Sequence, residues 1–182
     1  MIVNFSAAEE AALMDVAQRM CAAARTAPKA KGQDHIISAI VTGADKDALS
    51  SEMRRLADEY GFGFFNRDAD NVDESAAIVL IGSSLSEGGR GLGEGCRFCR
   101  KENCADCAKS ESVCVYDPLD LGIAIGSAVS VAADGRIDNR VMFSVGKAAI
   151  SLGMLGKEAA MVFGIPLSIG GKSPYFDRKP KK

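Results

Sequence analysis

Tryptophan is absent from this 182-residue sequence, which has only 3 tyrosines, 8 phenylalanines and 1 histidine. So few rings do not supply the aromatic platforms on which proteins stack unpaired bases. Positive and negative charges nearly cancel, and the formal net charge of -2 gives no positive field that would attract nucleic acid or an anionic membrane. We therefore expect no nucleic-acid partner.

Long apolar runs are also missing, because none reaches the roughly 18–20 residues that cross a bilayer. The N-terminus carries Glu9 and Glu10 and has no basic segment ahead of an apolar core, unlike a secretory signal. We therefore expect a cytoplasmic protein with no membrane partner. In a reducing compartment, its 6 cysteines are thiols or metal ligands rather than structural disulfides.

Helical and strand patterns alternate along the chain. Helical spacing of apolar residues predicts helices over 7–25, 45–60, 117–133 and 138–155. Ser6 and Asp138 are the expected N-caps of the first and last, and Gly61 is expected to end the second. A short link after residue 133 predicts that the last two helices form an antiparallel pair.

Three short apolar runs, at 36–42, 76–82 and 159–166, predict buried strands. Together with the helices they favour an α/β (α+β) arrangement of two or three layers. The length suits a single domain spanning residues 1–182.

Five of the six cysteines lie between Cys96 and Cys114, in the pattern C-x2-C-x4-C-x2-C-x6-C. The surrounding segment, 83–114, is rich in glycine and charge and is too polar to bury inert thiols. A loop of that length inside a compact domain needs a stabilising reason, which metal ligation supplies. The sequence therefore predicts an inserted metal-binding loop, with ligands drawn from Cys96, Cys99, Cys104, Cys107 and Cys114.

An iron–sulfur cluster, most simply a 4Fe–4S cluster, suits this spacing best. Structural zinc takes two C-x2-C arms about 12–20 residues apart, whereas the gap here is 4 residues. Basic residues among the cysteines favour thiolate over thiol. Zinc and a redox dithiol are the alternatives. Either Cys107 or Cys114 completes the ligand set, with Cys114 preferred, and Cys21 is expected to be a core thiol.

The cysteines belong to a wider set of motifs. Cys96-x2-Cys99-x4-Cys104 is followed by Cys114-Val-Tyr, Asp120-Leu-Gly-Ile-Ala-Ile-Gly-Ser-Ala-Val, Asp138-Asn-Arg-Val-Met, and Pro166-Leu-Ser with Phe176-Asp-Arg. From Cys96 to Arg178 this set resembles a prokaryotic family of ferredoxin-domain-containing proteins of unknown function. The resemblance implies an iron–sulfur cluster but no particular reaction.

Most of the chain also resembles the nitroreductase family. Residues 22–33, Ala-Ala-Ala-Arg-Thr-Ala-Pro-Lys-Ala-Lys-Gly-Gln, are similar to the family's APSxxNxQP loop, which lies between a helix and a strand. Segments 76–82, 120–133 and 159–166 take the places of its next strand, its long dimer helix and its final strand. The resemblance implies nitroreductase-like helix and sheet layers, with the cysteine-rich loop as an insertion.

The nitroreductase resemblance also implies FMN at the interface of a homodimer. Loop cations would face the flavin phosphate, because an uncompensated dianion is costly to desolvate. Gly32 would let the backbone approach the ring, although the family has Asn there and also an Arg-rich N-terminus that this chain lacks. The expected cofactor-binding residues are Arg25, Lys29, Lys31, Gly32, Gln33 and Arg178.

A homodimer is expected on other grounds too. The apolar helix at 119–133 carries Gly122 and Gly126 on one smooth face and needs cover on more than one side.

Two hypotheses from different classes follow. In the first, the chain is an iron–sulfur redox protein that passes single electrons to a redox partner protein or to a bound flavin. With a flavin, it would be a flavin-dependent oxidoreductase of unknown substrate. In the second, the metal is structural zinc and the chain is a scaffold or interaction module without catalysis.

Overall fold

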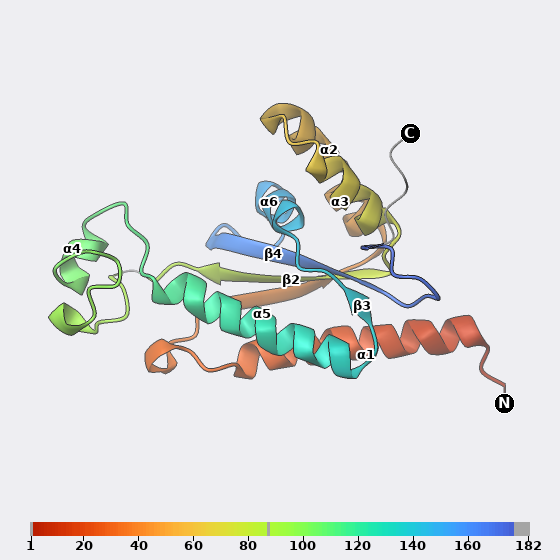
Figure 1. Cartoon of the computed structure of the whole chain (residues 1–182), viewed down its shortest axis with the longest axis horizontal. Helices are drawn as coiled ribbons and strands as arrows, with labels where there is room; N and C mark the ends of the chain where they lie inside the picture. Colours follow the sequence, from red (N-terminus) through yellow and green to blue (C-terminus); the bar gives the residue numbers. More distant parts are fainter. Residues whose placement is uncertain (1, 87, 177–182) are drawn as a thin grey trace.

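A four-stranded antiparallel sheet forms the middle of the computed structural model, which describes residues 2–86 and 88–176 (Figure 1). Its spatial order is β1-β2-β4-β3. The strands are β1 Ile36–Val41, β2 Ala77–Ser84, β3 Asp138–Asn139 and β4 Ala159–Ser168. The first seven residues of β2 are buried, as expected for a β-branched run between two covered faces.

Helices cover both faces of this sheet, so the fold has three layers. On one face lie α1 Phe5–Thr26 and α5 Tyr116–Asp134; on the other lie α2 Gly43–Tyr60, α3 Phe64–Asp73 and α6 Phe143–Ser151 (Figure 1). The remaining helical segments are short and lie in loops: η1 Ala30–Gly32, η2 Gly93–Gly95 and α4 Cys104–Ala108.

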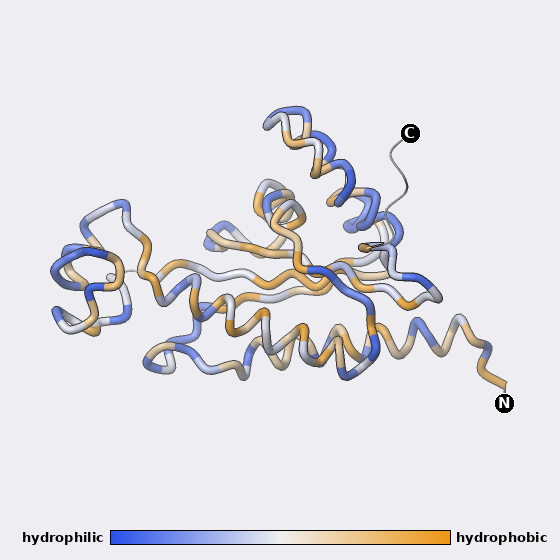
Figure 2. Tube along the Cα trace, viewed as in Figure 1, coloured by the Kyte–Doolittle hydropathy of each residue, from blue (hydrophilic) through white to orange (hydrophobic). Residues whose placement is uncertain are grey.

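Alternate side chains of β2 serve the two layers. Ile78 and Leu80 pack in the cluster with α2, α3 and α6. Val79 and Ile81 pack in the cluster with α1 and α5. This is the period-two alternation of a strand covered on both sides. Figure 2 shows the strands and α5 largely in hydrophobic colours, whereas the outer side of α2 is hydrophilic.

Two glycines bring α6 very close to β4. A methyl group on Gly146 would overlap the backbone carbonyl of Val162, and one on Gly164 would overlap the side chain of Val145. No larger residue fits at either position without moving the backbone.

The α/β layers predicted from the sequence are confirmed. All three expected strands and the first three helices are present, with ends that differ by a few residues. Gly61 ends α2 in a left-handed conformation with φ of 68°, as expected for a C-terminal glycine.

Several local predictions were wrong. The predicted helix 138–155 is α6 alone, because Asp138 and Asn139 pair with β4 as strand β3 and so cap no helix. The predicted antiparallel helix pair does not form, because α5 and α6 lie on opposite faces of the sheet (Figure 1). Asn4, rather than Ser6, caps α1, and its side chain accepts from the Ala7 amide at 2.8 Å.

Two helices were not predicted. α3 is a polar ten-residue segment that is kept in place by Phe65 and Val72 in the core, and α4 lies among the cysteines. Within the described residues, no helix combines the length and the apolar character that crossing a bilayer requires.

Candidate metal centre

Five of the six cysteines lie in a lobe, residues 85–86 and 88–115, that joins β2 to α5 and projects beyond one end of the sheet (Figure 1). We call this segment the cysteine lobe. Its helix α4 is capped by Asn103, whose side-chain oxygen accepts from the Asp106 amide at 2.9 Å. Figure 2 shows the lobe mostly in hydrophilic colours, so apolar packing contributes little to its structure.

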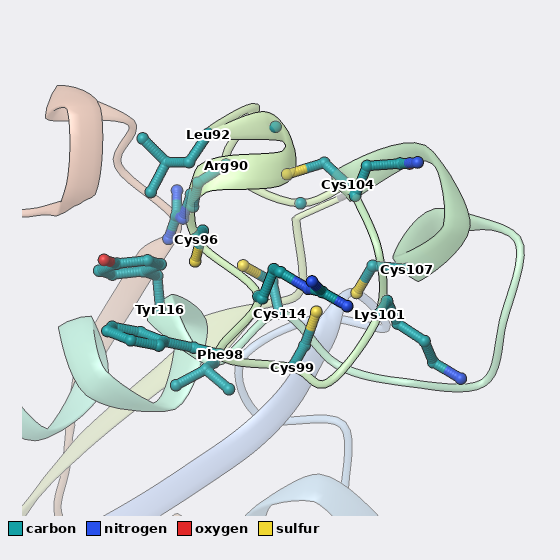
Figure 3. Close-up of a pocket in the computed structure, with 15 residues that line it drawn as sticks. Arg90, Leu92, Cys96, Phe98, Cys99, Lys101, Cys104, Cys107, Cys114 and Tyr116 are labelled. Atoms are coloured by element: carbon teal, nitrogen blue, oxygen red, sulfur yellow. The ribbon is translucent and has the colours of Figure 1, made fainter.

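Five free thiols surround one pocket in the lobe. The pocket has about 360 Å³ of space unfilled by protein atoms, part of it open to solvent. In Figure 3 the sulfur atoms of Cys96, Cys99, Cys107 and Cys114 point toward its centre, and Cys104 lies at its edge.

The backbone at the first C-x2-C turn has an unusual conformation. Cys96 is right-handed, with φ of -86° and ψ of -63°, and Arg97 is left-handed, with φ of 52°. Arg100, directly after Cys99, is left-handed as well, with φ of 62°. Left-handed residues other than glycine are uncommon and cluster at functional sites. A right-handed residue followed by a left-handed one aims successive N–H groups into a concavity that binds anions, as around iron–sulfur clusters.

Charge at the pocket has one sign. Among the described residues that line it, Arg97 and Lys101 are cations, Arg90 is a cation paired with the buried carboxylates of Asp117 and Asp120, and none is a carboxylate. The pocket therefore suits a group of negative charge.

The thiols differ in how readily they ionise. The pKa of Cys99 is lowered, chiefly because the Lys101 amide donates a hydrogen bond to its sulfur. Burial, followed by the hydrogen bond with Cys99 and the charges of Cys114 and Cys104, raises the pKa of Cys107 to about 11. The thiols are thus close enough to influence one another, and Cys99 is better prepared than Cys107 to be a thiolate ligand.

The loop expected to hold FMN lies beside the lobe. Arg25 forms an ion pair with Asp34 at 2.9 Å. The ammonium group of Lys29 donates to three carbonyl groups at the end of α1, so it caps that helix. Lys31 donates to the Gly91 carbonyl in the lobe at 3.3 Å.

Three of the residues expected to bind FMN remain to be located: Gly32, Gln33 and Arg178. Gly32 is left-handed, with φ of 66° and open space where a side chain would stand. The Gln33 carbonyl accepts from Arg90 at 2.9 Å. Arg178 lies outside the described residues. The structure thus brings Lys31, Gly32 and Gln33 next to the lobe and engages Arg25 and Lys29 elsewhere, and FMN binding at this loop stays a prediction.

Sequence reasoning missed three buried charged residues at the base of the lobe, Arg90, Asp117 and Asp120. Asp120 stood in a motif and Asp117 at a predicted helix start, but nothing in the sequence marks Arg90 among the glycines as buried. Cys21 lies on α1 against the core, and burial raises the pKa of its thiol.

The same three-layer fold occurs in solved structures. The nitroreductase CinD from Lactococcus lactis in complex with nicotinic acid aligns with a TM-score of 0.58 and 15% identity, covering 87% of this chain and 81% of that one. A structure described as an oxidoreductase containing FMN aligns with a TM-score of 0.57 and 10% identity, covering 87% and 67% of the two chains. The fold is therefore nitroreductase-like.

The sequence itself is similar to a narrower group. A protein from Archaeoglobus fulgidus, described as uncharacterized, is 44% identical over 171 residues, which is 90% of each chain. The profile of a family described as "Uncharacterized protein containing a ferredoxin domain" matches residues 110–178. The chain belongs to this ferredoxin-domain family. The matched range includes Cys114 but begins after the other four cysteines of the pocket.

Proposed function

We propose that this chain is an iron–sulfur redox protein whose cysteine pocket holds a 4Fe–4S cluster. The observation that carries the proposal is the arrangement of five free thiols around one pocket. Such a cluster, when bound, takes up and releases single electrons. Membership of a ferredoxin-domain family and the fold of known oxidoreductases support a redox role.

The gap of only 4 residues between the two C-x2-C arms favours a cluster over the alternative, structural zinc. Four sulfurs at about 2.3 Å from one zinc ion lie only about 3.8 Å from one another. Among the described residues, no three Cys, His, Asp or Glu side chains converge closely enough to hold a single ion. A cubane instead takes each thiolate on a different iron and so suits a wider ring of sulfurs.

Four of the five thiols suffice for this role, and we assign it to Cys96, Cys99, Cys104 and Cys114, although the Cys107 sulfur points into the pocket and Cys104 lies at its edge (Figure 3). Cys107 is buried in α4, and its thiol donates to the Ser112 carbonyl at 3.7 Å. A thiol that donates keeps its proton, whereas a ligand must lose it. Cys114→Ser should therefore lose the cluster and Cys107→Ser should keep it. The opposite result would exchange the two assignments.

The surroundings supply what an anionic cluster needs. Arg97 and Lys101 would offset its charge, and Cys96 and Arg97 have the right-handed and left-handed backbone conformations that aim successive N–H groups at an anion. Phe98 packs against Tyr116, with ring centroids 6.1 Å apart, and so covers one side of the pocket (Figure 3). Phe98 is still 64% exposed on the projecting lobe, where a redox partner protein has access to the centre.

FMN is a second candidate cofactor, proposed because a solved structure with the same fold is described as containing it. At loop 25–33, Lys31 would be the cation for the phosphate, and Gly32 leaves room for a ring. Lys29 does not fit this role, because it caps α1. Titration of the protein with FMN tests the proposal. Quenching of flavin fluorescence that is lost in Lys31→Met would support it, and no quenching at high micromolar FMN would end it.

We further propose that the chain is a homodimer through α5. Leu119 and Ile123 are 48% and 38% exposed on that helix, and open space surrounds the positions where Gly122 and Gly126 would carry side chains. A partner helix could therefore approach closely.

Metal analysis of protein purified without oxygen tests the function directly. We expect brown protein with about four irons and about four acid-labile sulfides per chain. Colourless protein with one zinc and no sulfide would instead support the scaffold hypothesis.

A further inference from the structure

The side chain of Arg90 is buried to an unusual degree for a charged residue in a loop. It is 1% exposed, in a lobe where most neighbouring residues are exposed. Arginine is almost never fully buried unless it is paired, because losing its hydration is costly. Arg90 also lines the cysteine pocket.

Two hydrogen-bond acceptors and a second carboxylate surround its guanidinium group. Nη2 lies 2.9 Å from Asp117 Oδ1 and 2.9 Å from Asp120 Oδ2. Nη1 donates to the Gln33 carbonyl at 2.9 Å. Only the planar fork of arginine reaches such a set from one position.

Each carboxylate holds a further segment of the chain. Asp120 accepts from the Ala30 amide at 3.1 Å. Asp117 Oδ2 accepts from the amide of Ser86 at 3.1 Å and from its hydroxyl at 2.8 Å. Arg90 therefore joins α5, loop 30–33 and the start of the cysteine lobe at one buried point.

This point lies directly behind two thiols of the pocket. Gly89, the residue before Arg90, lies against Cys104 and Cys114, since a methyl group there would be 3.7 Å from Cys114 Sγ. The Asp117 amide donates to the Cys114 carbonyl at 3.0 Å. A shift of Arg90 would therefore move the backbone at Gly89, which lies against both cysteines, and at Asp117, which is bonded to Cys114.

We propose that Arg90 is a positioning residue that fixes Cys104 and Cys114 before a metal group arrives, an inference that rests on the proposed function. One guanidinium serves two buried carboxylates, so a neutral residue at 90 leaves both uncompensated. Within the described residues, neither Arg90 Nε nor Asp117 Oδ1 has a hydrogen-bond partner. The network therefore lowers the stability of the fold somewhat but holds the three segments that it joins in one defined geometry.

The first test uses metal-free protein, so it does not depend on the cluster. Alkylation of each cysteine is followed by mass spectrometry in the wild type, Arg90→Met and Arg90→Lys. Cys104 and Cys114 should react several-fold faster in Arg90→Met than in the wild type, and Arg90→Lys should lie between. The rate at Cys21, on α1, should not change. Lys109→Met, which removes an exposed cation of the same lobe, is the matched control and should behave as the wild type.

Unchanged rates at Cys104 and Cys114 in a folded Arg90→Met protein would overturn the proposal. If Arg90→Met does not fold, the comparison uses Arg90→Lys, which keeps the charge but cannot make all three contacts. Alkylation of Cys104 and Cys114 at the wild-type rate in Arg90→Lys would overturn the proposal as well.

The second test uses protein loaded with iron and sulfide. The reduction potential and electron paramagnetic resonance line shape should change in Arg90→Lys but not in Lys109→Met. A lower melting temperature with both properties unchanged would mean a merely structural role and overturn the proposal. If the wild type binds no cluster, the proposed function fails, and the alkylation rates still decide whether Arg90 positions the thiols.

Discussion

The pair Gly88 and Gly89 offers a controlled perturbation of the cysteine pocket. Both are left-handed, with φ of 79° and 70°, so alanine at either costs about 1–2 kcal/mol in backbone conformation. Their surroundings differ: nothing lies within 4 Å of a methyl group at Gly88, whereas one at Gly89 would be 3.7 Å from Cys114 Sγ and 3.8 Å from Cys104 Cβ. These are ordinary contacts, so neither substitution adds a clash.

The backbone cost should be the same in both variants. For a chain of this size, about 1–2 kcal/mol corresponds to a fall in melting temperature of roughly 2–8 °C. We expect Gly88→Ala to show only this loss. Gly89→Ala should show the same loss and also a lower content of iron and sulfide or an altered visible spectrum, because the methyl group limits how Cys104 and Cys114 can move to bind metal.

Calorimetry and metal analysis on both variants, prepared side by side without oxygen, make the comparison. Equal iron content and identical spectra for Gly88→Ala and Gly89→Ala would contradict this prediction. Metal binding would then not depend on the space behind Cys104 and Cys114.

Three further predictions concern ligands, assembly and packing. Cys99→Ser should lose most of its iron, because an open iron site makes a cluster labile, whereas Cys21→Ser should keep it; full iron in Cys99→Ser would make the ligand assignment wrong. Ile123→Glu should convert a dimer into a monomer in light scattering at micromolar concentration, and a monomeric wild type would end the dimer proposal. Gly146→Ala should destabilise the fold by about 1–3 kcal/mol or more in denaturant unfolding, because α6 would be pushed from β4, whereas Gly63→Ala, in open space, should change little.

The sheet could be predicted from the sequence because its strands carry strong local patterns. The buried β-branched run of β2 needs no tertiary information to be recognised. α3 was missed because most of its residues, in FFNRDADNVD, are polar, and its apolar contribution comes mainly from Phe65 and Val72. β3 was read as helix because two residues are too few for a period, and pairing with β4 alone makes them a strand.

The metal pocket, too, could be predicted from the sequence only in part. Cysteine spacing predicted which thiols belong together, because the ligands are close in sequence. The base of the lobe could not be predicted in this way, since Ala30, Arg90 and Asp120 are far apart along the chain and meet only after folding. A buried arginine among glycines carries no local pattern of its own.

We propose that the cysteine pocket holds a one-electron centre. A redox titration of anaerobically loaded protein, followed by electron paramagnetic resonance, tests it most directly. We predict a signal that appears on reduction with a one-electron slope of about 59 mV per tenfold change in the ratio of oxidised to reduced protein. A two-electron slope of about 30 mV, as for a dithiol, or no reducible signal in iron-loaded protein, would contradict it.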